Sequence, residues 1–219
     1  MTAVSYSGLQ LFDTCPRAFH DRYYKNIRGA HFSSPAMTRG TKLHHCAEEY
    51  IRGDTTVLPK ELKHKEKMFD RLIKMKAIPE MEFNLTTEWG NIPFEDTANG
   101  NVRGMIDCIA DTGEVVEVLE WKTGKRYDSH ADQRSLYTLA AFILYPKANF
   151  VRTSSVYFDL SGADETLEAE RSNLPVLQMT WMKRINRTRP PRDYIARPGR
   201  NCGNCASNRK NGGTCAAGK

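Results

Sequence analysis

The chain has 219 residues, of which 26% are charged and 40% hydrophobic, and it carries a formal net charge of +6 with a pI near 9.0. This length and composition fit a globular protein with a substantial core in one domain, and they exclude a disordered or fibrous chain. No apolar run approaches the length of a membrane span and no apolar leader follows Met1, so we expect a soluble intracellular protein. The basic charge favours a polyanionic partner, and nothing indicates an ATP-driven motor because no Gly-x4-Gly-Lys loop is present.

The N-terminal segment predicts two short helices that Pro16 separates. Ser7 and Gln10 match a capping box, which places a helix start near Ser7. Apolar anchors follow at helical intervals, and Cys15 stands at the break. Taken alone, Cys15 indicates only a small buried residue.

Residues 29–39 have the composition of a loop, and a helix is predicted from about Thr41 to Arg52. His44 and Glu48 lie four residues apart on one face of this helix. Neutral imidazole is a common ligand for transition metals, so His44 is a candidate metal ligand. The alternative is a surface His–Glu pair.

Between this helix and the next apolar stretch, the pattern predicts a charged helix over 61–77, a strand over 82–89 and a loop over 90–100. The lysines of the charged helix are interpreted as a solvated face, part of which could approach DNA.

Residues 102–110 and 115–121 predict the two strands of a β-hairpin, with turn residues at 111–113. If Ala110 pairs with Val115, then Asp107 and Glu120 become diagonal neighbours on one face, roughly 7–8 Å apart at the backbone. Two carboxylates at that separation can hold one divalent cation, with Lys122 beside them. An odd register without a bulge would separate them. Because the strand around Glu120 is apolar, we interpret these charges as functional rather than as a solvated face.

After the hairpin, His130–Tyr145 gives the clearest helical pattern, with Gln133 and Tyr137 one turn apart, and 150–160 predicts a further strand. The order hairpin, helix, strand predicts a mixed sheet with a crossover helix packed on it. Residues 162–176 are interpreted as a loop with a short helix, and 178–186 as helical.

Residues 183–200 are rich in arginine, and only Asp193 opposes them. This segment suits contacts to phosphates, and Trp181 and Tyr194 could stack on bases. A merely solubilising tail is the alternative.

Cys202 and Cys205 form a Cys-x2-Cys pair, and Cys215 supplies a third thiol. Three ligands leave a tetrahedral or cuboidal site one short, and Cys15 could complete it if the chain ends meet. Zinc sites usually combine two such pairs. The one-plus-three pattern therefore favours an iron–sulfur cluster, with zinc as the alternative.

Together these motifs resemble, in collinear order, the RecB-type nucleases of the PD-(D/E)XK superfamily. The similarity is to the compact branch with a one-plus-three cysteine cluster, which includes the CRISPR-adaptation exonucleases and the AddB nuclease domain. The gap between Cys205 and Cys215 is longer than is usual there. The matching segments are Cys15-Pro16-Arg17, Gly40-Thr41-x-x-His44, Gly104-x-Ile106-Asp107, Glu120-Trp121-Lys122-Thr123-Gly124 and Gln133-x-x-x-Tyr137.

The resemblance implies a restriction-endonuclease-like α/β fold in which a mixed sheet is flanked by helices and a metal cluster clasps the terminal segments. It implies one nuclease domain over 1–219, with a catalytic core at about 36–160 and cluster-binding segments at 1–28 and 177–219. The expected location is the cytoplasm, or the host cytoplasm if the chain is phage-encoded.

The implied activity is metal-dependent exonucleolytic hydrolysis of DNA in recombination, repair, phage DNA processing or CRISPR adaptation, with DNA and a pathway protein as partners. The cation would polarise the scissile phosphate, and the cluster would be structural. The alternative is a catalytically inert iron–sulfur or zinc DNA-binding subunit. The residues implied are Asp107, Glu120, Lys122, Gln133 and Tyr137 for catalysis; His44, Asp107, Glu120 and the Trp121 carbonyl for Mg²⁺ or Mn²⁺; Cys15, Cys202, Cys205 and Cys215 for a [4Fe–4S] cluster; and Arg17, Arg184, Arg187, Arg189 and Arg192 for DNA.

Overall fold

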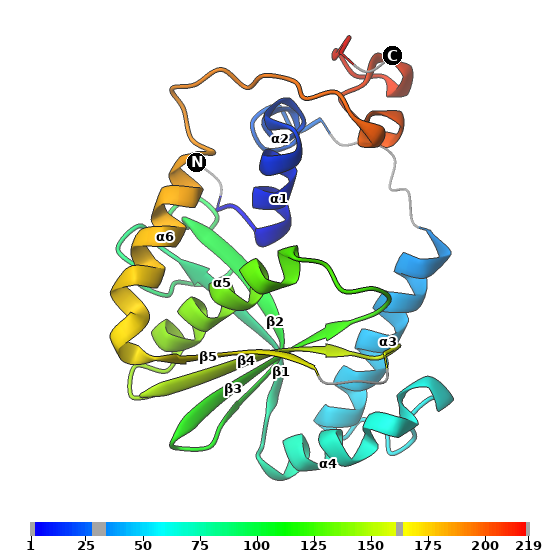
Figure 1. Ribbon diagram of the computed structural model, residues 1–219, viewed down its shortest axis with the longest axis vertical. Helices are drawn as coiled ribbons and strands as arrows, with labels where there is room; N and C mark the ends of the chain where they lie inside the picture. Colours follow the sequence, from blue (N-terminus) through cyan, green and yellow to red (C-terminus); the bar gives the residue numbers. More distant parts are fainter. Residues whose placement is uncertain (1–2, 28–33, 161–163, 218–219) are drawn as a thin grey trace.

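The computed structural model describes residues 3–27, 34–160 and 164–217. Its centre is a five-stranded mixed sheet in the order β1-β2-β3-β4-β5, as the hairpin–helix–strand pattern predicts in outline (Figure 1). Only β3 and β4 pair in parallel, because α5 (Ser129–Leu144) crosses over between them. The strands are β1 (Ile78–Leu85), β2 (Val102–Asp111), β3 (Val115–Lys122), β4 (Phe150–Tyr157) and β5 (Glu165–Glu170).

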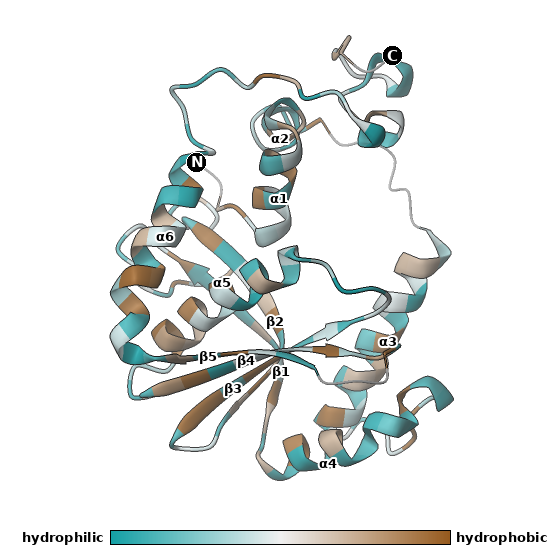
Figure 2. Cartoon of the chain, viewed as in Figure 1, coloured by the Kyte–Doolittle hydropathy of each residue, from teal (hydrophilic) through white to brown (hydrophobic). Residues whose placement is uncertain are grey.

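Two apolar layers cover the two faces of the sheet, as the alternation of side chains along a strand requires. On β3, Val116 and Val118 face α5, whereas Leu119 and Trp121 face the opposite layer. The α5 layer also holds α1 (Tyr6–Thr14), and α6 (Leu174–Asn186) contributes Trp181 and Ile185 to it. The opposite layer holds α3 (Pro35–Arg52), the 3₁₀ helix η1 (Lys60–Lys65) and α4 (Glu66–Lys74). Figure 2 shows the apolar residues concentrated on the strands and the hydrophilic ones on the outer helices.

The two predicted N-terminal helices are confirmed as α1 and α2 (Pro16–Tyr23), which meet at Cys15. The helix cap differs from the prediction: the Ser5 hydroxyl, not Ser7, accepts the hydrogen bond of an N-terminal amide, that of Gly8.

Several predicted boundaries are wrong. The helix predicted from Thr41 begins at Pro35, because the Ser34 hydroxyl accepts the Met37 N–H at 3.2 Å and proline suits the first helical position. Residues 29–33 of the predicted loop lie outside the described residues. The strand predicted over 82–89 is β1, which starts earlier and ends at Leu85. The helix predicted over 61–77 is divided into η1 and α4, and β5 forms where only a loop and short helix were expected.

Beyond α6, the chain crosses α1 and α2 and returns the C-terminal segment to the N-terminal helices (Figure 1). Tyr194 packs against the rings of His20, at 4.4 Å between centroids, and Phe12. The Arg197 guanidinium donates a hydrogen bond to the Asp13 carbonyl at 2.7 Å. The helices α1 and α2 and the segment that follows α6 therefore lie together. No helix in the described part of the chain is long and apolar enough to span a membrane.

Candidate active site

The candidate site lies where the pairing between β2 and β3 stops. Cys108 and Leu119 are the last residues paired across these strands, so Asp107 and Glu120 occupy the next positions. The Asp107 Oδ2 atom accepts the Trp121 N–H at 2.7 Å, so this side chain occupies the place of a strand carbonyl. The hairpin thus ends in a carboxylate that lies between its two strands.

The hairpin prediction is correct in parity and wrong in detail. Ala110 pairs with Glu117 rather than with Val115. A slip of two residues leaves every side chain on its predicted face. Asp107 and Glu120 consequently stand opposite each other on the two strands, instead of lying on a diagonal.

Glu120 lies at the centre of a network of polar side chains from β3 and α5. Its Oε1 atom accepts hydrogen bonds from Lys122 Nζ at 3.0 Å and Gln133 Nε2 at 2.7 Å. Lys122 Nζ also donates to Gln133 Oε1 at 2.7 Å. Tyr137 accepts a hydrogen bond from Gln133 and donates its own to the Met105 carbonyl at 2.9 Å. The structure therefore brings together all five predicted catalytic side chains.

Burial sets the charge of this network. Glu120 is only 7% exposed, and its burial, followed by the charge of Asp107, raises its pKa to about 8, with Lys122 opposing the rise. Burial also raises the pKa of Tyr137 well above its usual value, so this side chain remains a neutral phenol. A carboxyl held this far above its ordinary pKa is a feature of functional sites.

His44 approaches the carboxylates from α3, on the other side of the sheet. Its Nδ1 atom lies 3.3 Å from Asp107 Oδ1. Glu48, predicted to share its face, instead pairs with Arg52 at 2.8 Å and His45 at 3.2 Å. Of the two helix residues singled out from the sequence, only His44 joins the site.

The donors present suit a hard divalent cation. Glu120 Oε2 is buried and has no hydrogen-bond partner, which leaves one carboxylate oxygen beside Asp107 available to a ligand. Within residues 3–27, 34–160 and 164–217, however, no three His, Cys, Asp or Glu side chains lie close enough to hold a metal ion. The residue types therefore fit Mg²⁺ or Mn²⁺, although they do not form a closed coordination shell. The Trp121 ring points away and stacks on Phe158 at 5.6 Å.

Glu80 is an acidic residue near the site that the sequence did not single out. It stands between the paired positions Pro79–Cys108 and Met81–Ile106, and is therefore opposite Asp107 on β1. Its φ of +53° is unusual for a glutamate, and burial followed by the charge of Asp107 raises its pKa. The predicted strand began two residues later, so Glu80 lay outside every predicted element.

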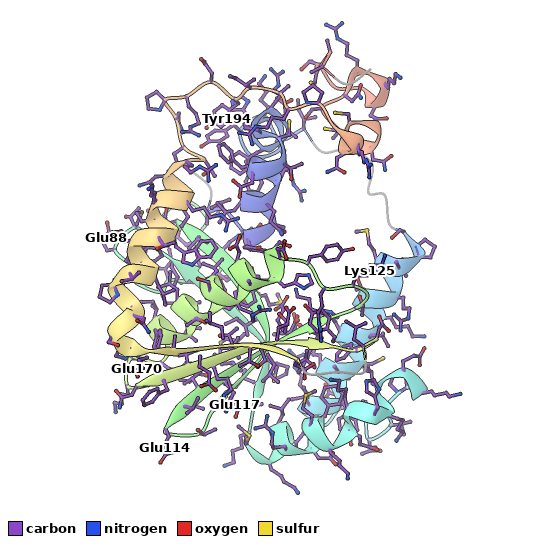
Figure 3. All side chains as sticks on the ribbon, in the orientation of Figure 1. Glu88, Glu114, Glu117, Lys125, Glu170 and Tyr194 are labelled. Carbon is purple, nitrogen blue, oxygen red and sulfur yellow. The ribbon has the colours of Figure 1, made fainter. Side chains whose placement is uncertain are left out.

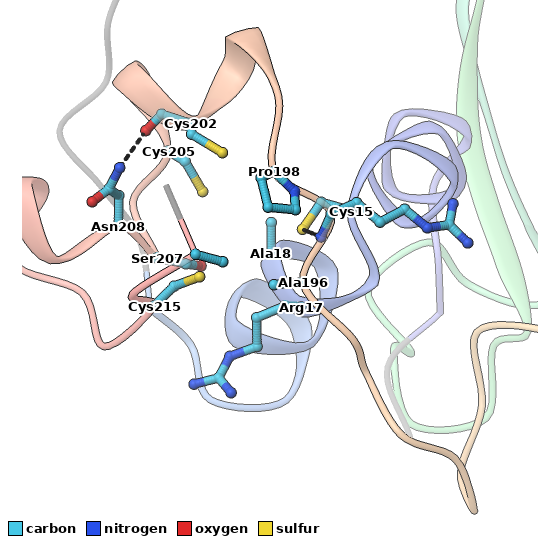
Figure 4. Close-up of a pocket in the computed structure, with 12 residues that line it drawn as sticks. Cys15, Arg17, Ala18, Ala196, Pro198, Cys202, Cys205, Ser207, Asn208 and Cys215 are labelled. Carbon is cyan, nitrogen blue, oxygen red and sulfur yellow. Dashed lines mark hydrogen bonds between the residues drawn. The ribbon is translucent and has the colours of Figure 1, made fainter. Parts of the chain in front are cut away.

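The four cysteines expected to bind a cluster line one pocket between α2 and the C-terminal segment (Figure 4). Backbone amides donate to two of the sulfur atoms, from Arg197 to Cys15 Sγ at 3.4 Å and from Gly199 to Cys202 Sγ at 3.3 Å. Arg17 fastens this region by hydrogen bonds to Asp21 and Thr214, both 2.9 Å long. The four cysteines are brought to one pocket, but in the described part of the chain no three of them approach within the spacing of a metal site.

The arginines predicted to bind DNA make contacts within the protein. Arg184 bridges Asp13 and Asp132, with both contacts at 2.8 Å, and Arg189 donates to the Asn101 side chain. Arg187 is half exposed and lies 3.3 Å from Asp13, and Arg192 lies over the Phe12 ring. The predicted stacking of Trp181 on bases is wrong, because this side chain is 2% exposed and donates to Ser135. Tyr194, shown beside α1 and α2 in Figure 3, is likewise packed on the N-terminal helices.

A carboxylate pair with a neighbouring lysine, on two strands of a five-stranded mixed sheet flanked by helices, defines a protein of the restriction-endonuclease-like class. A family model described as the PD-(D/E)XK nuclease superfamily matches residues 3–209, and the chain belongs to this superfamily.

The comparison with one solved structure agrees at the level of the fold. The crystal structure of SSO0001 is similar with a TM-score of 0.52 and 16% sequence identity, over 99% of this chain and 87% of that one. A candidate exonuclease from Eubacterium rectale has a TM-score of 0.47 and 13% identity, over 85% and 81% of the two chains. A search of curated proteins gave no match.

Proposed function

We propose that this protein is a metal-dependent deoxyribonuclease that degrades DNA from free ends. One observation carries the proposal: the buried, partly unpartnered Glu120 lies beside Asp107, while Lys122 is fixed in place by Glu120 and Gln133. A protein that only bound DNA would gain nothing from a buried carboxylate pair, which costs free energy unless a cation compensates it.

Asp107, Glu120, His44 and the Trp121 carbonyl would hold Mg²⁺ or Mn²⁺, which when bound would polarise the scissile phosphodiester. Lys122 donates two of its three hydrogens to Glu120 and Gln133. The third is available to the negative charge that develops on a phosphoryl oxygen. Gln133 and Tyr137 hold Lys122 and Glu120 in register, because their hydrogen bonds link both residues to the β2 backbone.

DNA would approach over the loop that follows β3. Lys125 is exposed there (Figure 3). Arg126 is exposed as well, and the Tyr127 side chain is 61% exposed. Two cations and an exposed ring suit a single strand, since phosphates pair with the charges and a base can stack on the ring. Arg187 and Arg192 would add phosphate contacts. We expect Arg17, Arg184 and Arg189 to contribute less, because their guanidinium groups are already engaged within the protein. Arg17 contacts Asp21 and Thr214, Arg184 contacts Asp13 and Asp132, and Arg189 contacts Asn101.

The cysteine pocket would hold a [4Fe–4S] cluster, with zinc as the alternative. Cys15 from the N-terminal region and Cys202, Cys205 and Cys215 from the C-terminal segment converge on it, and amide N–H groups point at two of the sulfurs. Hydrogen bonds of this kind stabilise cluster thiolates. The cluster would join the chain ends rather than take part in hydrolysis. These features favour the RecB-type branch with a cysteine cluster, and thus a role in recombination, repair, phage DNA processing or CRISPR adaptation.

The test compares linear and circular DNA, each single- and double-stranded, with Mn²⁺ and with EDTA. We expect degradation of linear substrates only, and complete loss of degradation with EDTA. Cleavage of closed circles at a similar rate would refute action from ends. If EDTA leaves the only measurable DNA activity, binding, unchanged and no cleavage is seen with Mn²⁺, the inert DNA-binding subunit is the correct reading.

A further inference from the structure

A second polar stripe on α5 lies beside the residues already assigned to the site. Its members are spaced four residues apart, so they share one face of the helix, and that face lies over β4. Each contacts one β4 side chain through a hydrogen bond of 2.8 Å. The three pairs are His130 with Tyr157, Arg134 with Ser155, and Thr138 with Thr153.

The three pairs differ in exposure along the helix. Thr138 and Thr153 are fully buried, and Arg134 is 9% exposed. The ring of His130, near the start of α5, is only half-buried. Packing therefore shields the Arg134 and Thr138 pairs from solvent, whereas the pair of His130 with Tyr157 reaches the surface through the His130 ring.

This outer pair adjoins the catalytic lysine in two ways. Tyr157 is the register partner of Lys122 in the parallel β3–β4 pair. His130 precedes Gln133 by one helical turn, and Gln133 accepts a hydrogen bond from Lys122 at 2.7 Å. The positive charge of Lys122 also lowers the pKa of His130, second to the effect of burial.

The hydrogen bonds determine which ring nitrogen of His130 carries the proton. Arg134 and Tyr157 both donate to Glu165 Oε2 at 2.9 Å. Burial opposes ionisation of Glu165, but these two hydrogen bonds prevail and lower its pKa, so it is a carboxylate and only accepts. Tyr157 has one hydrogen, which it gives to Glu165, so its oxygen must accept from His130 Nδ1. The lone pair of neutral His130 is consequently on Nε2.

That lone pair is unused. No described residue makes a hydrogen bond to His130 Nε2, and this atom is not among the buried unpartnered atoms, so it is open to solvent. Three of the polar groups assigned to the site above already have other roles. Lys122 is engaged as a hydrogen-bond donor, and Asp107 and Glu120 are the proposed cation ligands.

We propose that His130 is a further catalytic residue and the proton acceptor for the attacking water; this rests on the proposed nuclease function. As the water oxygen bonds to phosphorus, its proton passes to Nε2, either directly or through one intervening water. The phosphorus–oxygen bond to the leaving nucleotide breaks, and that oxygen keeps the electron pair and takes a proton from solvent. His130 then returns its proton to solvent, so one water is consumed for each bond hydrolysed.

The surroundings of His130 support this role. The Tyr157–Glu165 pair receives its Nδ1 hydrogen and stabilises the imidazolium, as a buried carboxylate does for other catalytic histidines. Burial, followed by the charge of Lys122 from β3 and helped by that of Arg134 from α5, lowers the pKa of His130 against the opposing charge of Glu165, so the ring is neutral at pH 7. Tyr127 contacts the ring edge at 5.5 Å between centroids, and Arg126 lies over Tyr157.

The test is His130→Gln, assayed at saturating Mn²⁺ across pH 5.5 to 8.5. Glutamine can still donate to Tyr157 but cannot accept a proton. We expect kcat to fall by roughly 10²- to 10⁴-fold, the usual contribution of a general base. We also expect loss of the acidic limb that wild type shows as His130 protonates. DNA affinity, measured with Ca²⁺ in place of Mn²⁺, should stay within about threefold. His130→Ala should regain activity with added imidazole.

Thr138→Val is the matched control, because it breaks the innermost, fully buried pair, about two helical turns from His130. It should lower stability and leave the pH profile unchanged. If His130→Gln keeps wild-type kcat and pH profile, or loses DNA affinity in step with activity, the inference is refuted. If wild type itself shows no metal-dependent cleavage, it is the proposed function that fails.

Discussion

Glu120→Gln should make the metal-free protein more stable while it abolishes nuclease activity. The pKa of Glu120 rises from 4.5 to about 8 because the carboxyl is buried beside Asp107. At about 1.4 kcal/mol per pKa unit, ionisation at pH 8 costs the folded state about 5 kcal/mol more than the unfolded one. Glutamine keeps an oxygen for Lys122 and Gln133, and it places an amide where the unpartnered oxygen faces Asp107. Because Lys122 loses an ion pair, we expect a net gain of roughly 2–4 kcal/mol at pH 8.

The pH dependence gives this prediction its sign. A carboxyl whose pKa is raised by folding destabilises the folded state as pH rises from its unfolded pKa, 4.5, to its folded pKa, about 8. The difference between variant and wild type should therefore be small at pH 5 and largest at pH 8.

Urea unfolding in EDTA at pH 5 and pH 8 measures both values. Glu114→Gln is the matched control, since this exposed glutamate lies in the turn of the same hairpin (Figure 3). This substitution should leave the free energy of unfolding unchanged at both pH values. Added Mn²⁺ should stabilise wild type and not Glu120→Gln. The prediction fails if Glu120→Gln lowers the free energy of unfolding at pH 8, or changes it equally at both pH values. Either result would show that ionised Glu120 does not destabilise the metal-free protein.

Two further predictions concern the arginines and the cysteines. Arg184→Ala should lower the free energy of unfolding by about 1–3 kcal/mol, because it leaves Asp13 and Asp132 without their shared partner. Arg187→Ala should cost less than about 1 kcal/mol but lower the salt dependence of DNA binding by about one phosphate contact, since this side chain is half exposed. Denaturation and salt titration of DNA binding measure the two effects. A larger loss of stability in Arg187→Ala and a larger change of salt dependence in Arg184→Ala would contradict these roles. Anaerobically purified protein should be brown, with visible absorbance and about four irons per chain. Cys215→Ser should lose most of the colour, whereas Cys46→Ser, which alters a cysteine of α3, should retain it. A colourless protein with stoichiometric zinc would identify the zinc alternative.

The sequence was informative where local patterns suffice. The apolar alternation and the turn at 111–113 predict the hairpin, and parity alone keeps Asp107 and Glu120 on one face. The register depends on the turn, in which Thr112 pairs with Val115 and moves every partner by two residues. Helix spacing was enough to place Gln133 and Tyr137 together.

Other features depend on residues far apart in the chain. Arg184 was expected to bind phosphate because its neighbours are basic, but its partner Asp13 comes from α1, 171 positions away. β5 is polar and half-exposed, so it carries no apolar signal; its pairing with β4 defines it. The tautomer of His130 depends on Tyr157 and Glu165, from two later strands, and no motif in the sequence joins these three residues.

In the proposed function, Lys122 and the two carboxylates are the groups that hydrolyse DNA. Its most direct test is the Mn²⁺-dependent degradation of end-labelled linear DNA by purified wild type, Lys122→Ala and the matched control Lys147→Ala, which alters an exposed lysine. We expect wild type and Lys147→Ala to degrade the substrate at equal rates. Lys122→Ala should be slower by at least about 10²-fold while it remains folded and unfolds cooperatively. Full activity in a folded, pure Lys122→Ala protein would contradict the assignment of this site.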